Sequence, residues 1–100
     1  MRVRIAPQAR EDLDSIWIYI ARESGNMRAA TRLIEVISDQ FRLLSKFPFI
    51  GKRLASDRHP QVRTLACGNY IIFYTPKAEE LRILRVIHAK RDAYAVFDQD

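Results

Sequence analysis

Residues 63–92 read RTLACGNYIIFYTPKAEELRILRVIHAKRD, and this stretch is the most informative part of the chain. Two runs rich in β-branched and aromatic residues, Tyr70–Tyr74 and Leu81–Ile87, predict strands, and the segment Thr75–Glu80 between them predicts a turn. A further strand is expected near Val62–Cys67, followed by a Gly-Asn turn. Three successive strands with short connections favour antiparallel pairing.

The middle one of these strands is apolar on both faces. Because side chains alternate along a strand, Tyr70, Ile72 and Tyr74 point to one side, and Ile71 and Phe73 point to the other. A strand with two apolar faces needs cover on both sides of its sheet. We therefore expect a layer of structure, or a partner, on each face.

The first half of the chain predicts a short strand and two helices. Met1–Ala6 alternates apolar and charged residues, which suits an edge strand. Pro7 suits the first position of a helix and Gly25 its left-handed cap, while Asn26 can cap a second helix over Met27–Lys46. The order β-α-α-β-β-β predicts an α+β fold, in which an antiparallel helical hairpin packs on a mainly antiparallel sheet.

The sequence pattern leaves more than one possibility for what packs on the second face of the sheet. Two helices can cover only one face, so a C-terminal segment containing Tyr94, Val96 and Phe97 could supply part of the other layer, and a partner protein the rest. The alternative is a tightly curled sheet that covers itself. Between the helices and the strands, Lys52–Gln61 predicts an irregular basic loop.

Length and composition limit the possible classes of protein. One hundred residues, 48% hydrophobic and 29% charged, are expected to form one globular domain spanning residues 1–100. The net charge of +5 favours approach to nucleic acid or to an acidic partner. One cysteine and two histidines predict no disulfide, metal site or cofactor. Without an apolar run near ~18 residues or a signal-peptide core, we expect a cytoplasmic protein that uses no membrane.

Four segments of the chain form a pattern, in order and at compatible spacing. They are Ala9–Gly25, the series Ala30, Ile34, Ile37, Phe41, Leu44, Pro48 and Gly51, then Gly68–Tyr74, and finally Arg85–Asp92. Together they resemble the ParE branch of the RelE/ParE superfamily of type II toxins. The resemblance implies a helical hairpin on a curved antiparallel sheet, and a toxin that forms a hetero-oligomer with a cognate antitoxin.

Two activities divide this superfamily. RelE-type members cleave mRNA on the ribosome, and ParE-type members inhibit DNA gyrase. Metal-free cleavage needs a base, an acid and cations for the phosphate, and the resemblance offers His88, Arg91 and Tyr94 for these roles. Leu65 and Phe97 stand about where such nucleases carry an arginine and a tyrosine, so the set is incomplete. We therefore favour gyrase inhibition without a catalytic residue, with a ribosome-dependent mRNA endonuclease as the alternative.

Candidate target-binding residues gather where the last strand ends in a cationic cluster. An alternative for Arg85 is a structural ion pair with Asp92 or Glu80, and an alternative for His88 is a hydrogen bond that holds the turn. The candidates for target contact are Arg63, Arg85, His88, Lys90 and Arg91.

Candidate antitoxin-binding residues are apolar side chains that the two helices do not need for their own contact. Ile18, for example, lies about 140° around the helix from Leu13, at ~100° per residue, so it should be exposed. Such residues also occur as ordinary surface positions. The candidates for antitoxin contact are Ile18, Val36, Leu43, Tyr70, Ile72 and Tyr74.

Overall fold

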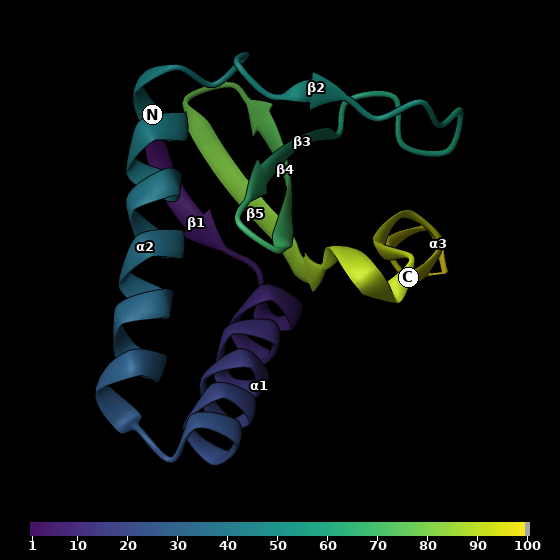
Figure 1. The fold of residues 1–100 in the computed structure, drawn as a ribbon. Helices are drawn as coiled ribbons and strands as arrows, with labels where there is room; N and C mark the ends of the chain where they lie inside the picture. The colour runs from purple at the N-terminus through teal and green to yellow at the C-terminus, as the bar shows by residue number, and fades with distance from the viewer. Residues whose placement is uncertain (100) are drawn as a thin grey trace.

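The computed structural model describes residues 1–99 (Figure 1). Its elements are β1 (Arg2–Ile5), α1 (Pro7–Ser24), α2 (Met27–Lys46), β2 (Lys52–Arg53), β3 (Arg63–Cys67), β4 (Tyr70–Lys77), β5 (Glu80–His88), the 3-10 turn η1 (Ala89–Arg91) and α3 (Ala93–Asp98). The five strands form one sheet in the order β1-β5-β4-β3-β2. β1 runs parallel to β5, and the other pairs are antiparallel. The predicted α+β fold is confirmed, with β2 and α3 as elements that the pattern did not predict.

The helical hairpin begins and ends where the sequence predicts. Gly25 closes α1 in the left-handed region, with φ of 65°, which glycine adopts without steric cost. The side chain of Asn26 then accepts hydrogen bonds from the backbone N–H groups two and three residues later, at 2.9 and 3.2 Å. The two helices run antiparallel and are joined across their contact by a hydrogen bond from Trp17 Nε1 to Thr31 Oγ1 at 3.1 Å.

The turn between β4 and β5 is shorter than the sequence predicts. Lys77 pairs with Glu80, so only Ala78 and Glu79 lie between the strands, with Ala78 at φ of 56°. Pro76 therefore belongs to β4 rather than to the turn. β3 begins at Arg63, opposite Tyr74, so Pro76 lies where β4 has a neighbour on one side only, a position that tolerates proline.

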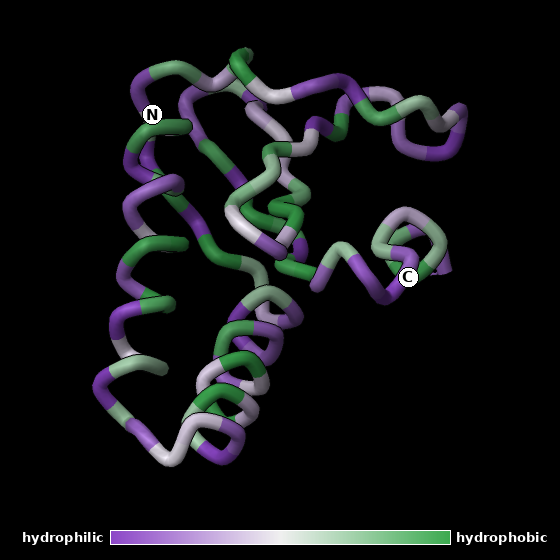
Figure 2. Tube along the Cα trace, in the orientation of Figure 1, coloured by the Kyte–Doolittle hydropathy of each residue, from purple (hydrophilic) through white to green (hydrophobic). Residues whose placement is uncertain are grey.

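Two apolar cores lie on the two faces of the sheet, and Figure 2 shows hydrophobic residues along β4 and β5. The helical hairpin covers one face. On the other face α3 places Phe97 parallel to Phe73, with ring centroids 4.4 Å apart. The C-terminal segment therefore supplies part of the cover of this face, as expected. The core residues of that second face are Val62, Phe73, Ile87, Ala93 and Phe97.

The hairpin covers the face of β4 that the sequence analysis assigns to an antitoxin. Tyr70 is 7% exposed, and Ile72 and Tyr74 are fully buried, because these side chains share one core with the inner faces of the helices. The expectation that these three residues are open to a partner is therefore wrong. Strand alternation separates the two faces, but it does not say which face the helices cover.

The segment before β3 also differs from its prediction. Lys52–Arg53 forms the edge strand β2 within the expected irregular loop. No helix within residues 1–99 is both long and apolar enough to cross a membrane.

Candidate functional site

A groove with a volume of about 620 Å³ opens between α1 and the end of β5, and we call it the α1–β5 groove. Its lining places it beside the middle of α1 and the end of β5, and Figure 1 shows β5 running into η1 near α1. Its lining residues come from α1 (Asp12, Ser15, Ile16, Tyr19), from the strands (Tyr70, Val86, His88) and from η1 (Lys90, Arg91).

An ion pair between α1 and β5 forms one wall of this groove. The Asp12 carboxylate accepts hydrogen bonds from Arg85 Nε at 2.7 Å and from Arg85 Nη2 at 2.9 Å. Both side chains are largely buried, 14% and 13% exposed, so this bidentate pair is well shielded from water. The expected partners Asp92 and Glu80 are therefore wrong for Arg85, and Glu80 instead pairs with Arg4 and Arg82.

Asp12 also completes the edge of the sheet. β1 pairs with β5 only as far as Ile5 opposite Ile83, and the chain then turns into α1. Beyond that point β5 has no neighbouring strand on the side opposite β4, so its N–H groups on that side need another acceptor. Asp12 Oδ2 accepts the N–H of Val86 at 2.9 Å. A side chain of α1 therefore takes the place of the missing strand.

A β-bulge lies next to Arg85. Phe73 pairs with Arg85 and Tyr74 pairs with Ile83, so Leu84 has no partner on β4. The extra residue shifts the alternation of β5 by one. Ile83 consequently lies in the core under the helices and Ile87 in the core under α3, although a regular strand would place them on one face with Arg85.

His88 holds the turn at the end of β5. Its Nδ1 accepts the backbone N–H of Lys90 at 3.1 Å, which places the ring proton of the neutral form on Nε2. The ring packs edge-on against Tyr70, with centroids 5.0 Å apart. This geometry matches the structural alternative for His88, and it fixes the backbone from which Lys90 and Arg91 project.

Lys90 and Arg91 form the exposed cationic rim of the groove. Both residues are exposed, and within residues 1–99 no carboxylate lies at ion-pair distance from either. Together with His88 they form what we call the basic turn. The sequence correctly groups these three residues.

Arg63 does not belong to the basic turn, contrary to expectation. It pairs with Tyr74, four residues along β4 from Tyr70, which is opposite His88, and its Nη1 donates to the carbonyl oxygen of Gly51 at 2.8 Å. Its guanidinium also lies 5.0 Å from the ring centroid of Phe49. Arg63 therefore fixes the loop that follows α2.

Tyr74 fixes the same loop from inside. Its hydroxyl donates to the carbonyl oxygen of Pro48 and accepts the N–H of Gly51, both at 2.9 Å. Burial raises the pKa of Tyr74, although the Gly51 hydrogen bond and the charge of Arg63 oppose this shift. A Cβ atom at Gly51 would lie 2.4 Å from the Tyr74 hydroxyl oxygen, so this close approach requires glycine.

The structure separates Tyr94 from the other two residues of the candidate nuclease set. Tyr94 lies on α3, half exposed, and packs edge-on against Phe73 with centroids 5.7 Å apart. Phe73 belongs to the core under α3, whereas His88 and Arg91 line the groove beside α1. The three side chains therefore do not converge on one site.

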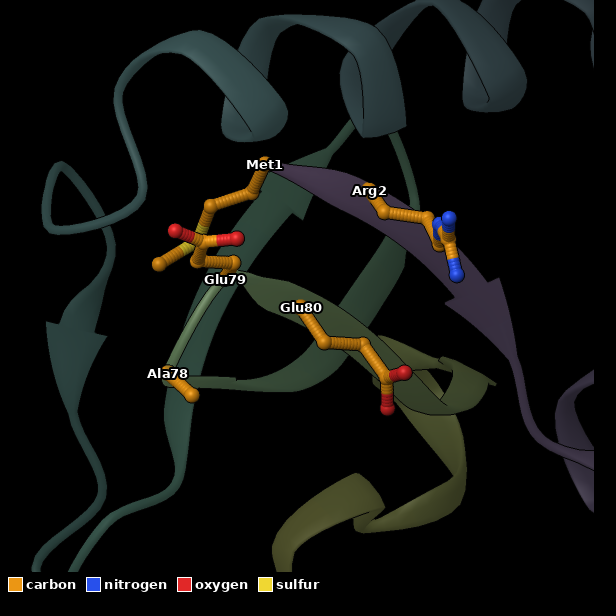
Figure 3. Close-up of a pocket in the computed structure, with 5 residues that line it drawn as sticks. All are labelled: Met1, Arg2, Ala78, Glu79 and Glu80. Atoms are coloured by element: carbon orange, nitrogen blue, oxygen red, sulfur yellow. The ribbon is translucent and has the colours of Figure 1, made fainter.

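Another hollow, of about 740 Å³, lies at the opposite end of β5 (Figure 3). Figure 3 shows Met1, Arg2 and the turn residues Ala78 to Glu80 around it, with Arg2 directed away from Glu79. The N-terminal ammonium group donates to the carbonyl oxygen of Ser45 at 2.9 Å. Groups of three or more metal-ligating side chains do not occur in the described part of the chain, residues 1–99.

The sequence does not single out the α1 side of the groove. Asp12, Ser15 and Tyr19 follow one another at spacings of three and four residues, which is typical of one helical face. This polar series was the available signal.

Burial raises the pKa of Tyr70, and the nearby Tyr19 phenolate, when ionised, would raise it further, so Tyr70 stays neutral near pH 7.

Comparison with known families assigns the chain to a class of toxins. A family model described as the ParE toxin of the type II toxin–antitoxin system parDE matches residues 3–93. The chain belongs to this family.

Two solved structures share the fold. The chromosomal ParDE toxin–antitoxin system from P. aeruginosa matches with a TM-score of 0.76 and 24% identity, covering 88% of this chain and 95% of that chain. The toxin–antitoxin complex RelBE2 from Mycobacterium tuberculosis matches with a TM-score of 0.61 and 27% identity, covering 87% and 95%. No curated protein matches the chain.

Proposed function

We propose that the protein is the toxin of a type II toxin–antitoxin pair, that it inhibits DNA gyrase, and that the basic turn contacts this target. The observation behind the proposal is the exposed pair Lys90 and Arg91, which no carboxylate in the described part of the chain pairs with and which a turn held by His88 presents. Family membership supports the toxin class. Cationic side chains on a rigid element can bind an acidic protein surface or DNA without performing chemistry.

The arrangement offers less support for an mRNA endonuclease. General acid–base catalysis needs proton-transfer groups within hydrogen-bond reach of one substrate position. Tyr94 packs on the sheet face under α3, while Arg91 lines the groove beside α1. Nδ1 of His88 already accepts a backbone N–H group. Binding therefore fits this site better than cleavage does.

An antitoxin is the second expected partner. Both similar structures are described as toxin–antitoxin assemblies. On this chain, the apolar residues Ile18, Val36 and Leu43 are 44%, 46% and 39% exposed on the two helices. We propose that they contribute to the contact with a cognate antitoxin, and that the two proteins form a hetero-oligomer.

A supercoiling assay tests the proposed function. The purified chain is incubated with gyrase, ATP and relaxed plasmid, and loss of supercoiling is expected. Lys90→Ala and Arg91→Ala should each raise the inhibitory concentration about five- to tenfold, as expected for a contact worth about 1 kcal/mol. Lys46→Ala removes an exposed cation at the end of α2 and serves as the matched control.

Unaffected gyrase would contradict this proposal if the same preparation arrests growth on entering cells. In that case the assay turns to ribosomes programmed with mRNA. Cleavage that disappears in Arg91→Ala would then support the endonuclease alternative.

A further inference from the structure

We propose that the α1–β5 groove binds single-stranded DNA, with one base stacked on Tyr19 and the adjoining phosphates on Lys90 and Arg91. This inference rests on the proposed function and deepens it, because a gyrase inhibitor works beside opened and cleaved DNA. The proposal follows from the chemistry of the groove, which combines one accessible aromatic ring with two exposed cations.

The aromatic part of the groove is provided by α1. Tyr19 is 60% exposed, so its ring can accept a stacked base. Tyr70, beside it, is only 7% exposed and is engaged edge-on with His88. One base at a time can therefore stack, above a floor formed by Ile16 and Val86. The volume of about 620 Å³ lies within the range of small-ligand sites, roughly 300–1,000 Å³.

The electrostatic part of the groove favours an anion. Asp12 is the carboxylate that lines the groove, and both of its oxygens are occupied by Arg85 and by the N–H of Val86. Its charge is therefore balanced within the wall. Lys90 and Arg91 on the rim are exposed, and no carboxylate of residues 1–99 lies at ion-pair distance from either, so both can meet incoming phosphates.

Single-stranded DNA fits this combination better than a duplex does. The bases of a duplex are stacked on one another, so their faces are not available to Tyr19, whereas an unpaired base can leave its neighbours and stack on the ring. An acidic peptide could use the two cations, but it would not require the Tyr19 ring.

Fluorescence anisotropy with a labelled short oligothymidylate tests the proposal on the full chain. Two phosphate contacts predict that the logarithm of the association constant falls with the logarithm of salt concentration at a slope of at least about −1.4 in magnitude, or −0.7 for each contact. Lys90→Ala and Arg91→Ala should each reduce that slope by about 0.7. Lys46→Ala should leave the slope unchanged.

Variants of Tyr19 distinguish the contribution of base stacking to binding from that of charge. Tyr19→Ala should weaken oligonucleotide binding about tenfold without changing the salt slope, because base–aromatic stacking is worth about 1–3 kcal/mol. Tyr19→Phe should bind like the parent chain, since the ring is kept. Phe47→Ala, which removes a 55% exposed ring at the end of α2, is the matched control.

Three results would each overturn the inference. The first is that Tyr19→Ala binds the labelled oligothymidylate as tightly as the parent chain does. The second is that an unlabelled duplex of the same length displaces the labelled oligothymidylate as well as unlabelled oligothymidylate does. The third is that a polyglutamate peptide displaces it equally well, which would assign the groove to an acidic protein segment. Gyrase inhibition without oligonucleotide binding would refute the groove proposal and leave the proposed function standing. Tyr19-dependent oligonucleotide binding by a chain that does not affect gyrase would support the groove proposal and refute the proposed function.

Discussion

Replacing Asp12 by alanine should lower the free energy of unfolding by about 3 kcal/mol, because breaking a buried ion pair from one side costs about 3–5 kcal/mol. The carboxylate makes three hydrogen bonds, to Nε and Nη2 of Arg85 and to the N–H of Val86. The side chains of the pair keep 14% and 13% of their surface exposed, which places the cost at the lower end of that range. A domain of this size has a total stability of about 5–15 kcal/mol. The loss is therefore a large fraction of the whole.

Urea denaturation and thermal unfolding both measure this loss. For a chain of about 100 residues, 3 kcal/mol corresponds to a decrease in Tm of about 12–24 °C. Asp14→Ala is the matched control, because this carboxylate on the same helix is exposed and its removal should change stability by less than about 0.5 kcal/mol. The double variant Asp12→Ala/Arg85→Met should lose less than the sum of the two single losses.

An Asp12→Ala variant as stable as Asp14→Ala would contradict a stabilising role for the Asp12–Arg85 ion pair. It would mean that the contact between α1 and the unpaired edge of β5 contributes nothing measurable, and that other contacts fix the end of β5 from which the basic turn projects.

Four further predictions concern buried groups. Tyr74→Phe should lower the free energy of unfolding, measured by urea denaturation, by about 1–3 kcal/mol, because the N–H of Gly51 loses its acceptor. Tyr94→Phe, at a half-exposed side chain of α3, should leave that free energy almost unchanged. Because burial raises the pKa of Tyr74 above its unfolded value near 10, the folded state holds this proton more tightly; stability should fall as pH rises above about 10, and less steeply in Tyr74→Phe. Gly51→Ala should cost about 1–3 kcal/mol through the clash with the Tyr74 hydroxyl, and an unchanged melt would contradict this. The buried Cys67 thiol, whose pKa is also raised by burial, should react with a thiol reagent at pH 8 only on unfolding, and rapid reaction of the native protein would contradict its placement.

Local features of the sequence were sufficient for the helical hairpin. The cap at Asn26, the left-handed turn at Gly25 and the apolar periodicity of Met27–Lys46 act within a few residues, and the structure has the predicted bounds. The six-residue helix α3 was not predicted, because one and a half turns are too short for a periodic pattern. The covering role of its Phe97 followed from the need of β4 for apolar cover on two sides.

Contacts between distant parts of the chain could not be predicted. Arg85 and Asp12 are 73 residues apart, and nothing in either segment indicates the other. The bulge at Leu84 shifts the faces of β5 by one residue without any proline or glycine to mark it. Arg63 was grouped with the basic turn because both are cationic, but antiparallel pairing places it opposite Tyr74, whereas His88 is opposite Tyr70.

Gyrase inhibition by the basic turn is tested by the amount of linear DNA that gyrase leaves when the reaction is stopped with detergent in the presence of the antitoxin-free chain. We expect linear product to accumulate with added protein, and the double variant Lys90→Ala/Arg91→Ala, folded to the same Tm, to need at least about tenfold more protein for the same effect. The same amount of linear DNA with and without a chain that still arrests growth would contradict it.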